Sequence, residues 1–241
     1  MSELEARPIP ATDIGQGVTS PVFSPDGLSV AFWSQADGTL KRISVTGGAA
    51  VTLCEADNPF GMSWGPAGIL VGQGAKGIMR VSPNGGAPET IVSVNPGEQA
   101  QSPQMLPDGR TVLFTLATGT AGDRWDNARI VAQTVKSGER KTLIEGGSDA
   151  RYLPTGHLVY AHEGVVFAVP FDPRRLETAG GPAPVVEGVS RASSSVSYST
   201  GSAQLSVSAT GTLIYRPGPV SNAGGQMSVG FFDRKGSAEL L

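Results

Sequence analysis

The sequence predicts an all-β chain, built as a β-propeller of about five four-stranded blades. Three observations support this: one turn motif recurs along the chain, a short β-rich run follows each copy, and glycine and proline are abundant. The 241 residues include 33 Gly and 18 Pro, well above the usual combined share of about 12 %. Frequent turns between short strands account for this composition.

The turn motif first occurs as Phe23-Ser-Pro-Asp-Gly27, and later copies begin at Trp64, Met105, Tyr152 and Val207. The glycines that close the five copies are 41, 41, 47 and 55 residues apart, near the roughly 40–45 residues of a four-stranded blade. Proline presets the first corner, Asp or Thr bonds back to the backbone, and glycine takes the left-handed position.

Short strands are expected in a fixed order after each turn. The runs that follow the turns are Ser29–Phe32, Ile69–Val71, Thr111–Phe114, Leu158–Tyr160 and Thr212–Tyr215. The runs that close the units are Val51–Cys54, Thr90–Val92, Lys141–Ile144, Pro184–Val186 and Ala238–Leu241. No window keeps a helical period over ten residues, so we expect blades at 20–54, 61–92, 102–144, 149–186 and 203–241.

The Phe23–Gly27 turn, followed by a strand and a Gly-Gly pair, resembles the WD40-like repeats of TolB-type propellers, although the Gly-His and Trp-Asp signatures of true WD40 repeats are missing. Three stretches, Leu4–Pro10, Gly47–Cys54 and Asp149–Tyr160, resemble the propeller that follows the kinase domain in many bacterial membrane-bound serine/threonine protein kinases. This resemblance implies a sensor or interaction domain in an extracytoplasmic position. The phosphate loop, catalytic loop and Asp-Phe-Gly motif of a kinase are absent from the sequence.

The two ends suggest a piece of a larger ring. Residues 4–9 match the outer strand of a preceding blade, and the fifth blade reaches its own outer strand at Leu241. An unclosed array leaves exposed strand edges. We therefore expect the chain to be part of a propeller with six or more blades.

Charge and composition exclude several classes of protein. The formal net charge is −3 and the basic residues are scattered, so we expect no nucleic-acid partner. No apolar run approaches the length of about 18 residues that spans a bilayer, and the N-terminus lacks the apolar core of a signal peptide. The single cysteine, Cys54, is expected to be a small strand residue.

Several motifs resemble catalytic or ligand-binding signatures but lack the context that the chemistry needs. Gly61–Gly65 fits the hydrolase nucleophile pattern around Ser63, and Gly72–Gly77 fits a dinucleotide pattern, yet neither precedes a predicted helix. His162-Glu163 starts a zinc motif whose second histidine is replaced by Val166. The Asp-Gly pairs lack the alternating carboxylates of a calcium loop. We expect no catalytic residue, metal or cofactor.

Both long insertions, 117–128 and 188–202, should lie on the face that carries the loops between blades. Loops on rigid scaffolds carry recognition, and an exposed Trp125 flanked by charges has the composition of an interface hot spot. The alternative is that Trp125 only packs its hairpin against the blade. The candidate binding residues on this face are Asp57, Arg124, Trp125, Asp126, Asp149, Arg151, His162 and Tyr198.

The predicted function is therefore that of a non-catalytic binding or sensor module for a protein, peptide or small ligand. One alternative is an accessory gating propeller of a prolyl-oligopeptidase-like hydrolase. A weaker alternative is an enzyme with a site on the propeller axis, which would need converging carboxylates, histidines or a metal. The first strands offer Val22, Met62, Gln104 and Arg151 for such a site, a set poor in catalytic groups.

Overall fold

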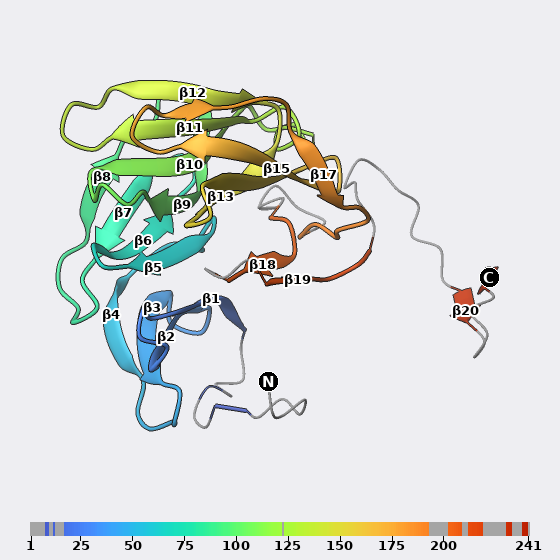
Figure 1. The fold of residues 1–241 in the computed structure, drawn as a ribbon. Coiled ribbons are helices and arrows are strands. Elements are labelled where there is room, and N and C mark those ends of the chain that lie inside the picture. Colours follow the sequence, from blue (N-terminus) through green and yellow to red (C-terminus); the bar gives the residue numbers. More distant parts are fainter. Residues whose placement is uncertain are drawn as a thin grey trace.

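The computed structural model describes residues 8–9, 12, 17–121, 123–192, 202–208, 212–218, 230–232 and 238–240. Every regular element in these ranges is a β-strand, and all strand pairs are antiparallel. The predicted all-β class is therefore confirmed. The first four sheets stand around a common centre with their first strands innermost (Figure 1).

Three sheets have four strands paired in chain order. The first contains β1 (Val18–Phe23), β2 (Ser29–Ser34), β3 (Thr39–Ser44) and β4 (Val51–Glu55). The second contains β5 (Met62–Gly65), β6 (Gly68–Gly72), β7 (Ile78–Val81) and β8 (Glu89–Val92). The third contains β9 (Glu98–Met105), β10 (Thr111–Thr118), β11 (Arg129–Thr134) and β12 (Arg140–Glu145).

The fourth sheet has the same plan with one addition. Its strands are β13 (Ser148–Leu153), β14 (His157–His162), β15 (Val165–Asp172), β16 (Glu177–Thr178) and β17 (Ala183–Val186). The long β15 pairs with β17 along one part of its length and with the short β16 at its end.

The C-terminal part is described as two separate ladders. Strand β18 (Leu205–Val207) pairs with β19 (Leu213–Tyr215), and β20 (Gly230–Phe232) pairs with β21 (Ala238–Leu240). No pairing joins the two ladders among the described residues, so a complete fifth blade over 203–241 remains a prediction. Of residues 4–9, predicted as an outer strand, residues 4–7 lie outside the described residues, and Pro8 and Ile9 belong to no strand.

The recurring turn uses the chemistry that its sequence indicates. Both Asp108 carboxylate oxygens accept hydrogen bonds: one from the amides of Arg110 and Thr111 at 2.9 Å, the other from the Thr111 hydroxyl at 2.6 Å. The closing Gly109 has φ 66°, a conformation that costs glycine little and other residues more. Each Pro-Asp-Gly turn is thus determined locally.

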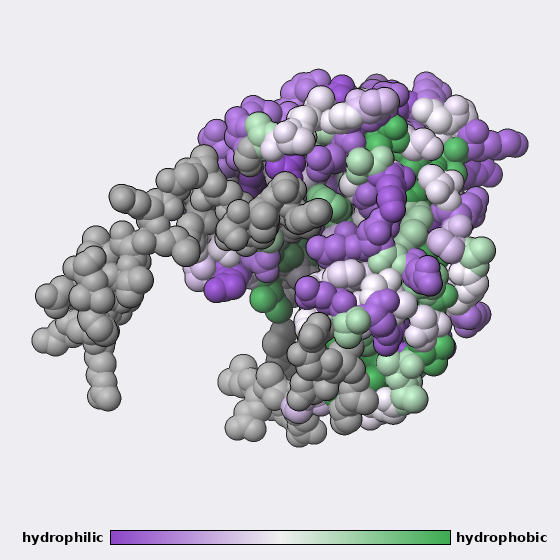
Figure 2. All heavy atoms as spheres, turned by 180° about the vertical axis from the view of Figure 1, so that it is seen from behind, coloured by the Kyte–Doolittle hydropathy of each residue, from purple (hydrophilic) through white to green (hydrophobic). Residues whose placement is uncertain are grey.

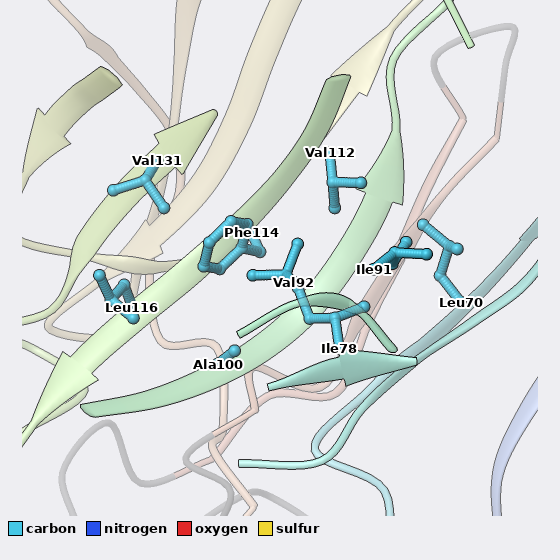
Figure 3. Packing of buried hydrophobic residues seen from close by; sticks show 9 residues of the cluster. All are labelled: Leu70, Ile78, Ile91, Val92, Ala100, Val112, Phe114, Leu116 and Val131. Carbon is cyan, nitrogen blue, oxygen red and sulfur yellow. The ribbon is translucent and has the colours of Figure 1, made fainter. Parts of the chain in front are cut away.

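The core consists of layers between neighbouring sheets rather than one central cluster. Between the second and third sheets, Leu70 and Ile78 pack against a group that includes Val112, Phe114 and Leu116 (Figure 3). All five side chains are at most 1 % exposed. Similar layers join the first sheet to the second and the third to the fourth. The second and third sheets carry apolar residues on both faces. The sheets therefore stack face to face.

The coloured part of the face seen from behind carries mainly polar residues (Figure 2). Figure 2 shows hydrophilic residues over most of the view from behind, with smaller hydrophobic patches between them. Among the described residues, no helix is long and apolar enough to span a bilayer.

Candidate functional site in the central channel

The four inner strands share a backbone irregularity near their start. Ser20, Gly61, Ser102 and Asp149 have φ values of 54°, 81°, 51° and 57°, and each lies five residues before the proline of its turn. Left-handed conformations are uncommon for residues other than glycine. In β1 and β13 the register shifts across this position, which is the behaviour of a β-bulge. Bulges re-aim side chains next to functional sites, and these face the propeller axis.

Asp149 is the centre of a buried hydrogen-bond network. One carboxylate oxygen accepts from the Ser102 hydroxyl at 2.5 Å and from the Gln101 amide at 3.0 Å. The other accepts from the backbone amide of Ala203 at 2.9 Å and from the Ser148 hydroxyl at 3.2 Å. Asp149 is only 6 % exposed. Asp149 therefore connects the third sheet, the fourth sheet and the segment that leads to β18.

Arg151 lies two residues further along β13 and supplies the second charge. Its Nη1 donates to the carbonyls of Ser102 at 2.9 Å and Ala150 at 3.0 Å. Desolvation lowers the pKa of Arg151 below its ordinary value, and the charge of Asp149 opposes this only in part. The guanidinium is thus a cation at the axis, held by carbonyl groups.

Two cavities meet at Arg151, which lines both. Cavity A has a volume of about 500 Å³ and opens toward the loops between blades. Short polar side chains give it hydrogen-bonding walls, and its only charged lining residues are Asp149 and Arg151. Its polar lining residues are Thr19, Ser20, Asn58, Ser102, Ser202 and Gln204.

Cavity B has a volume of about 410 Å³ and lies toward the Pro-Asp-Gly turns. Most of its lining is apolar and includes Trp64 and Tyr152, and Arg151 is its one charged lining residue within the described part of the chain. Ser63, the centre of the nucleophile-like pattern, is in β5 and lines this cavity. The residue is followed by a turn and β6, so the strand-to-helix context of a nucleophile elbow is absent there.

Trp125 is buried, which agrees with the alternative that it packs its hairpin against the blade and not with an exposed interface residue. It is 1 % exposed and packs with Phe60, Ala117 and Ala128, its ring centroid 6.2 Å from that of Phe60. The guanidinium of the buried Arg124 lies over its ring, 5.0 Å from the centroid. The insertion folds back between the second and third sheets because an indole gains more from this burial than from contact with water.

Asp126 and His162 lie near the same insertion. The Asp126 carboxylate forms an ion pair of 2.7 Å with Arg191, whose side chain is 4 % exposed, and accepts from the Glu163 amide at 3.2 Å. His162 ends β14, and its Nδ1 is buried without a hydrogen-bond partner among the described residues. These contacts join the two long insertions to the fourth sheet.

The remaining predicted residues are not part of this arrangement. Asp57 is exposed between the first and second sheets and pairs with Lys76. Tyr198 lies outside the described residues. Of the eight candidates, the structure brings Asp149 and Arg151 together at the axis, and it groups Arg124, Trp125, Asp126 and His162 at the insertion.

Sequence reasoning missed Gln101 and Ser102, which complete the Asp149 network. One signal could have identified Ser102: a polar residue recurs five positions before the turn proline, as Ser20, Ser102 and Asp149. The described residues hold no group of three or more His, Cys, Asp or Glu side chains that could share a metal ion.

No family model and no curated protein matches the sequence. Solved structures do resemble the fold. A putative TolB from Agrobacterium tumefaciens aligns with a TM-score of 0.58 and 17 % identity, over 93 % of this chain and 80 % of that chain. The calcium-binding protein regucalcin from the same organism aligns with a TM-score of 0.57 and 14 % identity. The alignment covers 92 % of this chain and 72 % of that chain.

TolB from Acinetobacter baumannii gives a TM-score of 0.51 and 17 % identity, over 64 % of this chain and 41 % of that chain. The present chain thus spans less than half the length of that protein. At such identities the likeness concerns the fold alone, and it confirms the all-β propeller fold predicted from the turn repeat. The number of blades stays a prediction. The chain folds as a β-propeller similar to those of the TolB proteins.

Proposed function

We propose that this chain is a non-catalytic recognition module, and that its ligand enters cavity A from the face of the inter-blade loops. A volume of about 500 Å³ lies within the usual range of ligand pockets, about 300–1,000 Å³. The propeller fold shared with TolB and regucalcin supports a binding role. The sequence resemblance supports a place in a bacterial receptor kinase.

One observation carries the proposal. The Asp149 carboxylate, the one acidic group that lines cavity A, is already held by four donors of the chain itself. Both oxygens of this carboxylate are therefore occupied in holding the inner strands together, which suits a structural role in the wall of the cavity. The hydroxyl and amide groups around it form a preorganised surface for an uncharged polar ligand, such as an extended peptide.

Panning a random peptide library against the folded chain tests this proposal. We expect a consensus motif to be enriched, and a synthetic peptide with that motif to bind in calorimetry. Asn58→Trp should weaken binding at least tenfold, because Asn58 lines cavity A and an indole would narrow the mouth.

Asn84→Trp is the matched control. Asn84 is exposed in the turn between β7 and β8 and does not line cavity A. If no motif is enriched, or if both variants bind the peptide equally well, a ligand in cavity A is ruled out. The alternative role, an accessory domain that gates a hydrolase, would then be favoured.

A further inference from the structure

Cavity B differs from cavity A in its chemistry. Its largely apolar lining includes the residues Trp64, Leu70, Met105, Tyr152 and Pro154. Among the residues that the structure describes, Arg151 is the only charged one in this lining. An apolar cavity with one convergent polar group is the usual design of a small-ligand site.

The guanidinium of Arg151 has N–H groups that form no hydrogen bond within the described residues. A guanidinium carries five N–H groups, and the two carbonyls of Ser102 and Ala150 engage only Nη1. Within the described residues, Nε and Nη2 have no hydrogen-bond partner, and neither atom is sealed from solvent. The same residues place no carboxylate oxygen within 4.0 Å of the guanidinium.

The neighbouring carboxylate does not fill this role. Asp149 turns its two oxygens toward Ser102, Gln101, Ser148 and Ala203. A partly buried cation without a paired anion is unfavourable. Its attraction for an anion is larger next to apolar walls than in water.

From these observations we propose that cavity B binds a carboxylate carried on a flat apolar body. Arg151 is the anchor, since its free N–H groups form a fork that matches the two oxygens of a carboxylate. Trp64 and Tyr152 supply the walls against which the apolar body packs. This second site lies on the side opposite to the loop face and does not depend on the ligand of cavity A.

Binding of hydrocinnamate tests the proposal on the unmodified chain. The indole N–H resonance of Trp64, assigned with Trp64→Phe, should shift saturably in two-dimensional NMR. Hydrocinnamamide has the same body without the charge and should bind at least tenfold more weakly. An amide that binds as tightly as the carboxylate would overturn the proposal, as would a Trp64 resonance that neither compound moves.

Substitutions at Ser63 give a second test that leaves Arg151 and its carbonyl contacts intact. Ser63 lines cavity B. Ser63→Glu introduces a competing carboxylate, whereas Ser63→Gln adds similar bulk without charge. Hydrocinnamate should bind the Glu variant at least tenfold more weakly than the Gln variant. Equal affinities would show that Arg151 does not recognise the charge.

Arg151→Gln should also lose the preference for the carboxylate, with Arg110→Gln, at an exposed turn position, as its control. This experiment reports on Trp64 in cavity B, and the peptide experiment reports on Asn58 in cavity A. Either proposal can therefore fail without the other.

Discussion

The hydroxyl of Ser102 donates a hydrogen bond of 2.5 Å to the carboxylate of Asp149, although the two residues are 47 positions apart. They are also equivalent positions of the repeat, each five residues before its turn proline and each with a positive φ. Strands β1, β9 and β13 form a bulge at this position. In β9 and β13 the bulge has a structural use, because it turns the side chain of one copy of the position toward that of the next. This contact joins two blades next to the axis.

Removing the Asp149 side chain should destabilise the fold. Asp149→Ala leaves the donors of Ser102, Gln101 and Ala203 without their acceptor, at an expected cost of about 2–3 kcal/mol in the free energy of unfolding. Urea denaturation followed by circular dichroism measures this cost. Asp57→Ala is the control, because its exposed ion pair with Lys76 contributes at most about 1 kcal/mol. Equal costs for the two variants would contradict the network's role.

Trp125 should behave as a core residue. Trp125→Ala is expected to cost about 3–5 kcal/mol in stability, as for other buried aromatic residues, because its ring fills the space beside Phe60, Ala117 and Ala128. Thermal and urea unfolding provide the measurement. Phe23→Ala removes an aromatic ring that is 65 % exposed and should change stability by about 0.5 kcal/mol or less. A small loss of stability in Trp125→Ala would instead indicate that Trp125 is an interface residue.

Gly61 should not tolerate a side chain. It has φ 81°, and an added Cβ would lie 2.9 Å from the Cα of Ser102. Gly97 has a similar φ of 85° and open space around its Cβ position, so Gly97→Ala isolates the cost of the backbone conformation, about 1–2 kcal/mol. Gly61→Ala should cost a further 1–3 kcal/mol or so from overpacking. Chemical denaturation measures the free energy of unfolding of both variants. A similar loss of stability in the two would mean that the inner strands move apart easily to make room for the added Cβ.

Acid should weaken the Pro-Asp-Gly turns. Desolvation raises the pKa of Asp108, but hydrogen bonds from Thr111 and Arg110 together with the Arg110 charge lower it more, so the net pKa is below its ordinary value. The unfolded chain therefore binds a proton more readily than the folded one. This stabilisation is present above the unfolded pKa of about 3.9 and is lost as the pH falls through the folded pKa.

Asp108→Asn removes this titration. The variant should be less stable than the wild type near neutral pH, and should lose less stability when the buffer is changed to about pH 3. Urea midpoints at the two pH values measure this difference. Glu139→Gln is the control, because the Glu139 side chain makes no hydrogen bond or ion pair within the described residues. An acid response of Asp108→Asn equal to that of the wild type would contradict the prediction.

The sequence by itself determined the features that depend on neighbouring residues. The turn at Pro107-Asp-Gly109 follows from the φ of proline and glycine and from a carboxylate that bonds the next two amides. The runs after such turns are strands because β-branched and aromatic residues favour them. Repetition of these local signals was enough to predict a propeller, and Asp149 and Arg151 could be named as residues of one of its faces.

Only the tertiary structure decided which side chains meet. The exposure of Trp125 depends on Phe60, 65 positions earlier, and no local pattern records whether an insertion folds outward or between two sheets. The bond between Ser102 and Asp149, and the free donors of Arg151 between two cavities, arise where strands of different blades converge on the axis. Such contacts depend on the positions of whole sheets, which are set by packing between their faces and not by the chain within each sheet.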